Sequence, residues 1–242
     1  MVLACADMGV PVGDLAYLTS LRTAPQTAFQ TEIALSDLFM ALAEEEFNSG
    51  GIETYAVHRV VGDPGAYQIY GQYTTAAERN HLSGPRARKA YKKVLDRMIL
   101  PLERVRLDPV KKGLWGAAKP VGADLTGDEA WRFTVRVAPE DVAKGDDVFE
   151  RIMEAMAYDE FPGGQVKSYT AFRVYGDTGR YIMYEHFTAR GSAQHATGER
   201  LPTVGREQME LLVTPFERLQ LEPFLAFGIQ YDSAKDSRRA AG

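Results

Sequence analysis

The side chains best suited to acid–base chemistry in this 242-residue chain are its four histidines, since imidazole titrates near neutral pH. His186 directly follows Glu185 inside an aromatic, β-rich run, YIMYEHF, that predicts a strand. Neighbouring residues of a strand point to opposite faces, so His186 and Glu185 cannot line one cavity side by side. We favour His186 as a general base; the alternative is a hydrogen-bonded polar residue on a sheet face.

His81 and His195 occupy equivalent positions in two similar stretches of the chain, each ahead of a predicted helix. They either brace a polar loop or act at a cavity mouth as an acid, a base or a hydrogen-bond donor. His58 and His186 have no histidine at their equivalent positions. The fold therefore does not require these two histidines.

Those equivalences come from an internal repeat with an offset of 114 residues; Tyr55 matches Tyr169, for example, and 169 − 55 = 114. Residues 13–109 align without a gap to residues 127–223, and 28 of the 97 aligned pairs (109 − 13 + 1 = 97) are identical. One doubling of a unit of about 100 residues indicates two copies of a small domain. We place the first copy at 1–110, a Gly-, Ala- and Pro-rich linker at 111–126, and the second copy at 127–242.

Each copy contains a Gly-Asp-x-Gly turn, at residues 62–65 and 176–179. Glycine permits a positive φ and aspartate caps its own turn, so the flanking aromatic and β-branched runs predict two strands paired as a hairpin. We interpret two Arg–Asp combinations, Arg59 with Asp63 and Arg173 with Asp177, as structural pairs across these turns.

The sequence predicts a strand and a helix before each hairpin, and a second helix and a fourth strand after it. This order, strand–helix–strand–strand–helix–strand, is the ferredoxin-like β-α-β-β-α-β unit, an α+β fold with helices on one face of the sheet. The other face is still apolar and aromatic, so each unit must bury it. We therefore predict that the two repeats close on each other as an intramolecular α+β barrel, with Trp115 of the linker plugging one end.

Composition argues against several classes of function. A net charge of −5 argues against nucleic-acid binding, and the sequence has neither an apolar run of membrane-spanning length nor a basic amphipathic helix that predicts membrane association. Residues 1–12 are expected to be a loose arm or an edge segment, in which the single cysteine, Cys5, is incidental. One cysteine and no signal-peptide pattern favour the cytoplasm. The usual nucleotide, zinc-protease and serine-nucleophile motifs are missing from the sequence.

Both copies resemble the antibiotic-biosynthesis monooxygenase family. The first copy does so through positions shared with the family, namely Gly50, Tyr55, Arg59, Gly62, Asp63, Tyr67, Tyr70, His81, Pro101 and Glu103. In the second copy, residues 181–187 resemble the family strand Tyr-x-x-Tyr-Glu-x-Trp, and His195 matches its following histidine. The resemblance implies an α+β barrel with a cavity between sheet and helices. It also implies oxygenation of anthrones or quinols by dioxygen without a metal.

The two copies depart from the family pattern in different ways. Gly71 stands where the family has glutamate, and the usual tryptophan is Tyr73 in one copy and Phe187 in the other. The copies have therefore diverged where chemistry is expected. Whether one cavity is active, or both, is left open at this point.

We predict a tailoring oxygenase for an aromatic polyketide or related phenolic polycycle, which hydroxylates it to a quinone or cleaves or rearranges a ring. The catalytic candidates are His186, His195, His81 and Glu185, and the substrate-binding candidates are His58, Tyr70, Gln72, Tyr184, Trp131 and Trp115. Dioxygen is the expected co-substrate, and no cofactor is expected to be tightly bound. Reduced flavin supplied by a flavin reductase and assembly into a homo-oligomer are both left open.

Two other functions compete with this prediction on the same fold. A polyketide cyclase would need an acid–base pair and no oxygen. A haem protein of the chlorite dismutase type would need one histidine facing an apolar cavity wide enough for haem.

Overall fold

The computed structural model describes residues 15–110, 115–116, 121–160, 164, 166–189, 191–195 and 198–228. The first half contains β1 (Leu15–Arg22), η1 (Pro25–Thr27), α1 (Ala28–Leu42), η2 (Ala43–Phe47), β2 (Ile52–Val60), β3 (Ala66–Tyr73), α2 (Thr75–Asn80), α3 (Pro85–Leu95) and β4 (Glu103–Pro109). After β5 (Trp115–Gly116), the second half contains β6 (Glu129–Arg136), η3 (Pro139–Asp141), α4 (Val142–Asp159), β7 (Val166–Val174), β8 (Arg180–Phe187), η5 (Gly191–Gln194), α5 (Leu201–Leu211) and β9 (Glu217–Gly228).

The predicted element order is confirmed in both halves, with the short helix α2 as an addition in the first. The arm at residues 1–12, with Cys5, lies outside the described residues. None of the described helices has the length and apolarity needed to cross a bilayer.

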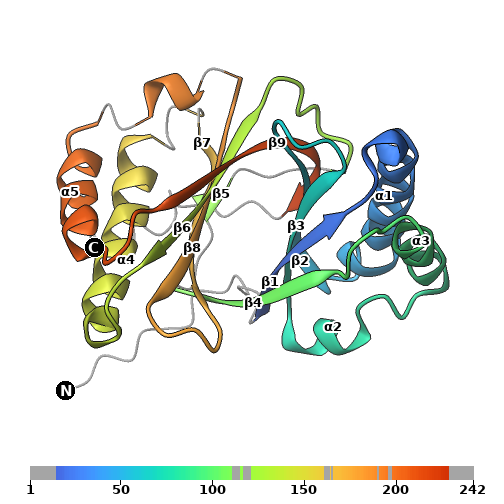
Figure 1. Cartoon of the computed structure of the whole chain (residues 1–242), viewed down its shortest axis with the longest axis horizontal. Helices are drawn as coiled ribbons and strands as arrows, with labels where there is room; N and C mark the ends of the chain where they lie inside the picture. The colour runs from blue at the N-terminus through green and yellow to red at the C-terminus, as the bar shows by residue number, and fades with distance from the viewer. Residues whose placement is uncertain are drawn as a thin grey trace.

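The strands form one closed antiparallel barrel, which confirms the predicted fold. The order is β4–β1–β3–β2–β9–β6–β8–β7, and β4 also pairs with β7. Figure 1 shows the barrel between two helix layers, with α1 and α3 on one side and α4 and α5 on the other. The backbone of β5 pairs with β7 at Tyr169, on the edge of β7 that β4 also uses. The proposed plug by the Trp115 side chain lies outside what the structure describes.

The two halves are joined by two seams of hydrogen-bonded strands with the same register. In one seam Leu107 of β4 lies opposite Val174 of β7, and in the other Leu221 of β9 lies opposite Val60 of β2. Both residues of the first pair are shifted by 114 relative to their counterparts (221 − 107 and 174 − 60). The fourth strand of each half pairs with the first strand of its own half and also with the second strand of the other half, which gives the barrel an approximate twofold symmetry.

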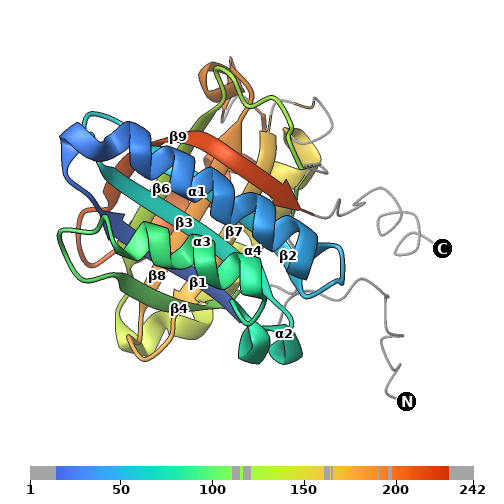
Figure 2. The same ribbon diagram turned by 90° about the vertical axis from the view of Figure 1, so that its right-hand side faces the viewer.

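Each strand separates two environments. One face packs against helices, in a first core around Phe39, Tyr55 and Phe227 and a second core around Phe149 and Tyr181. The opposite face fills the inside of the barrel. Figure 2 shows α1 and α3 lying across the strands of the first half. The alternation of residues along a strand thus decides whether a side chain meets the helices or the barrel interior.

The hairpin turns depend on glycine for two reasons. Gly65 has a φ of +86°, and Gly179 has a φ of +82°. A Cβ at either position would also collide with a backbone carbonyl oxygen, that of Thr23 or that of Val137. Each turn is therefore packed against the end of the first strand of its own half, β1 or β6, which explains why both copies keep this glycine.

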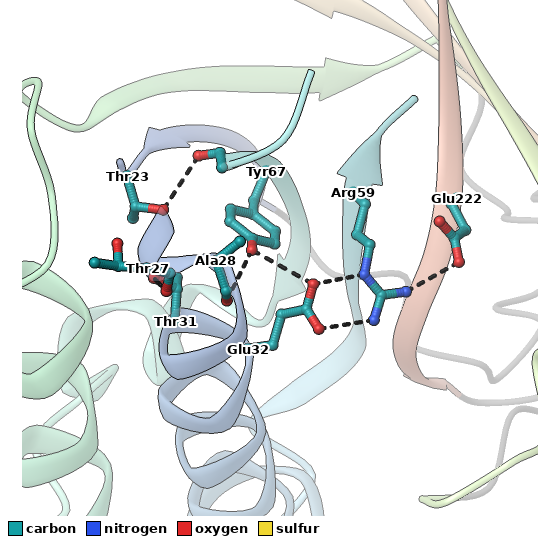
Figure 3. Close-up of polar contacts among 9 residues, drawn as sticks. Thr23, Thr27, Ala28, Thr31, Glu32, Arg59, Tyr67 and Glu222 are labelled. Atoms are coloured by element: carbon teal, nitrogen blue, oxygen red, sulfur yellow. Dashed lines mark hydrogen bonds and ion pairs between the residues drawn. The ribbon is translucent and has the colours of Figure 1, made fainter. Parts of the chain in front are cut away.

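The predicted pairing of Arg59 with Asp63, and of Arg173 with Asp177, is wrong. Arg59 instead binds Glu32 of α1 through two bonds of 2.7 and 3.0 Å, and it reaches Glu222 of β9 at 3.0 Å (Figure 3). The Arg59 side chain reaches the helix layer, whereas Asp63 at the turn contacts Arg22 at the end of β1. In the described contacts Asp63 pairs with Arg22, Asp177 with Arg136 and Arg180, and Arg173 with Asp146.

Replacing Arg59 with methionine should lower the free energy of unfolding by about 1 kcal/mol, because a two-point ion pair and a bond across a seam are both lost. The equivalent change at Arg173 serves as the control, since its guanidinium meets Asp146 at one nitrogen, 3.3 Å away. Urea unfolding of both variants measures the difference. An equal loss in the two variants would contradict this account.

Candidate active site

A cavity of about 240 Å³ lies in the second half between the sheet and helices α4 and α5. Its lining is mostly apolar and aromatic. Among the described residues that line it, the titratable groups are the side chains of Glu185 and His195 and the hydroxyl of Tyr169. The remaining lining residues are Phe133, Val135, Ile152, Met183, Leu201, Pro202, Gly205, Gln208, Met209, Leu212 and Phe216. Such a lining suits a planar aromatic ligand with few polar groups.

Glu185 is the buried acid of this cavity. It lies on β8 between its register partners, Trp131 of β6 and Tyr169 of β7, and its side chain is almost fully buried. Burial raises the pKa of the Glu185 carboxyl to about 7; His195 and Arg218 oppose the rise and Glu160 adds to it. A carboxyl with this pKa can take up or give a proton near neutral pH.

His195 lies between two carboxylates. Its Nδ1 contacts Oε2 of Glu160 at 2.9 Å, and its Nε2 lies 3.8 Å from Oε1 of Glu185. Burial works to lower the pKa of His195, but the Glu160 hydrogen bond and both carboxylates together raise it above its ordinary value. The imidazole can therefore carry a positive charge beside a developing anion.

Glu160 was not among the predicted site residues. The structure makes it the hydrogen-bond partner of His195, and Glu46 contacts His81 in the same way at 2.8 Å. Each glutamate precedes its histidine by 35 residues. That repeated spacing was the signal in the sequence that could have identified this pair.

Five of the predicted site residues face the interior of the barrel. His58 Nε2 lies 2.6 Å from the Tyr184 hydroxyl, and the Tyr70 hydroxyl donates to Gln72 at 3.1 Å. His186 is fully buried, and its Nε2 contacts Asp128 at 2.8 Å. A small cavity of about 10 Å³ beside His58, Tyr70 and Tyr184 has room for about one water.

The sheet thus separates His186 from Glu185, as strand alternation predicts. The catalytic role of His186 and the substrate-binding roles of its interior neighbours stay predictions. The geometry brings together Glu185 and His195 from the predicted set. Trp131 lies beside Glu185, with the guanidinium of Arg218 3.5 Å from its ring centre.

The raised pKa of Glu185 makes stability depend on pH. In the unfolded chain this carboxyl ionises near pH 4.3, but in the folded protein it holds its proton to about pH 7. Folded protein therefore binds more protons between these values, and stability should fall as the pH rises through this interval. Between pH 4.5 and 8 the free energy of unfolding of the parent should fall by up to about 3 kcal/mol relative to that of a Glu185→Gln variant, as measured by urea unfolding. A pH-independent difference would contradict the burial effect.

No protein-family model and no curated protein matches this sequence. Solved structures do match its fold. Two proteins, each described as a "putative monooxygenase", come from Lactobacillus acidophilus and Fusobacterium nucleatum; each aligns with a TM-score of 0.76 at 12% identity, covering 90% and 92% of this chain and 99% of theirs. The chain has the fold of these proteins. An anthrone oxidase-like protein shares it with a TM-score of 0.54 at 10% identity, over 88% of this chain and 92% of its own. The fold that the sequence resemblance implied is thereby confirmed.

Proposed function

We propose that this protein is an oxygenase that converts an anthrone, or a similar phenolic polycycle, to a quinone in the cavity of its second half. The observation that carries the proposal is a buried carboxyl, Glu185, with a pKa of about 7 beside His195 in an apolar, aromatic cavity. The fold shared with monooxygenase-named proteins agrees with it.

The proposed reaction begins when ionised Glu185 removes a proton from the acidic carbon or hydroxyl of the substrate. The resulting anion passes one electron to dioxygen, and the two radicals combine to a peroxide anion on the substrate carbon. Glu185 then returns its proton to this anion, which becomes a hydroperoxide and leaves the carboxylate ready for another turnover. Loss of water then leaves a carbonyl, so that CH₂ plus O₂ gives C=O plus H₂O. His195 stabilises the negative charge, and the apolar walls orient the ring and exclude bulk water.

The lining does not match a flavin nucleotide or a haem. No lysine or arginine is among the described residues that line the cavity, so a flavin phosphate finds no cationic side chain other than His195. The two nitrogens of His195 face Glu160 and Glu185, so neither is presented to an iron atom. We therefore favour direct reduction of dioxygen by the substrate anion.

Oxygen uptake with 1,8-dihydroxyanthrone tests the proposal. We expect uptake above the spontaneous rate without added flavin, one dioxygen per molecule converted, and a product whose mass reflects the gain of one oxygen and the loss of two hydrogens. Loss of water without oxygen uptake from a polyketide chain would favour the cyclase. A Soret band in the purified protein would favour the haem protein.

A further inference from the structure

The first half has no room for a counterpart of Glu185. Gly71 holds the equivalent position, and a Cβ there would lie 2.8 Å from two ring carbons of Tyr73. Tyr73 is itself buried, at 4% exposure, with its ring in the first core. Packing of the first core therefore holds the Tyr73 ring over Gly71, in the space that a counterpart of Glu185 would need.

The Tyr73 hydroxyl also takes over the contact that the acid makes with histidine. It lies 3.3 Å from Nε2 of His81, whereas in the second half Oε1 of Glu185 lies 3.8 Å from Nε2 of His195. Burial raises the pKa of Tyr73 well above its usual value, so the phenol stays protonated at neutral pH. Tyr73 thus satisfies the imidazole without supplying a base.

The helix layer of the first half also carries a larger side chain than the helix layer of the second half at one equivalent position. Gly205 of α5 lines the second-half cavity, and a Cβ added there would have no heavy atom within 4 Å. The equivalent residue of α3 is Tyr91 (205 − 91 = 114), which packs against the first core. A large ring in the first half therefore corresponds to open space in the second.

We propose that each chain has one substrate site, in the second half, and that the first half has replaced its own site with the packed rings of Tyr73 and Tyr91. The proposal rests on the proposed function for the class of ligand, a phenolic polycycle. It assigns Gly205 as the residue that keeps the working cavity open, and it leaves the Glu46–His81 pair as a structural brace.

Anaerobic calorimetric titration with 1,8-dihydroxyanthrone tests this inference, because binding without oxygen is separated from turnover. The parent should bind one molecule per chain. Gly205→Tyr, which places in α5 the residue found in α3, should lower the affinity at least tenfold. Glu210→Tyr is the matched control and should bind one molecule as the parent does, because Glu210 is an exposed residue of α5 that does not line the cavity. Tyrosine favours a helix more than glycine does, so α5 should be retained in Gly205→Tyr, which circular dichroism checks.

Two molecules bound per parent chain, or one molecule still bound by Gly205→Tyr with parental affinity, would overturn the inference and leave the proposed function standing. Should Gly205→Tyr fail to fold, the stoichiometry of the parent still decides between one site and two. No binding by the parent would instead refute the proposed function, and the inference with it.

Discussion

Replacing Glu185 with glutamine should lower kcat/KM for 1,8-dihydroxyanthrone by roughly 10²- to 10⁴-fold, the range that one positioned general base supplies. Glutamine keeps the shape of the side chain but cannot accept the proton. In the proposed site the ring system is held mainly by apolar walls, so most of the loss should appear in kcat. The residual activity should also lack the dependence on an ionisation near pH 7 that burial gives Glu185.

The internal repeat supplies a matched control. Tyr73→Phe removes the hydroxyl that contacts His81 in the first half and should leave kcat/KM within about twofold of the parent. A Glu185→Gln variant with nearly full activity would remove Glu185 from the mechanism. If His186→Ala were inactive at the same time while still folded, the base would be His186, the residue that the sequence analysis favoured for this role.

Replacing Phe227 with alanine should lower the free energy of unfolding by about 3–5 kcal/mol, the usual cost of deleting a buried aromatic ring. Phe227 lies on the last strand of the second half but is fully buried in the core of the first. Its ring centre lies 4.9 Å from that of Phe39, 4.4 Å from that of Phe47 and 5.8 Å from that of Tyr55. The loss therefore combines hydrophobic burial with several ring contacts.

Urea unfolding followed by circular dichroism and by tryptophan fluorescence measures this effect. Phe29→Ala, which deletes the same side chain at a site that is 70% exposed, is the control and should cost less than about 0.5 kcal/mol. Trp131 belongs to the second half, so a shared barrel requires both signals to shift together in Phe227→Ala. A fluorescence transition that stays in place while the dichroism shifts would indicate two halves that unfold independently.

The fold was predictable because the repeat, the Gly-Asp-x-Gly turns and the alternating strands all favour one architecture. The partners of Arg59 were not predictable in the same way. A carboxylate only four residues away in sequence looked like a partner, but Glu32 and Glu222 come within reach only once the helix layer and the second seam are in place. Spacing along the sequence therefore predicts a turn well, but it predicts poorly which side chains meet between a sheet and its helix layer.

The candidate site was predictable in composition and only partly in position. Strand alternation correctly separated Glu185 from His186, but it could not say which of them meets the cavity. The reason is that both faces of β8 are buried, one by helices and one by the barrel interior, so neither carries the polar pattern of a solvent-exposed face. Glu160 was missed because its role depends on a loop folding back over the end of α4.

The pairing of β9 with β2 across the second seam also has a consequence for the synthesis of the chain. The N-terminal half leaves the ribosome first, yet the outer edge of β2 has no strand beside it until β9 is synthesised. Val60 of β2, for example, pairs with Leu221, which is synthesised 161 residues later (221 − 60 = 161). Until then β2 offers unpaired backbone groups to any other nascent chain. A polypeptide released before residue 217 is therefore an open sheet prone to aggregation, and correct folding of this protein depends on synthesis of the last strand.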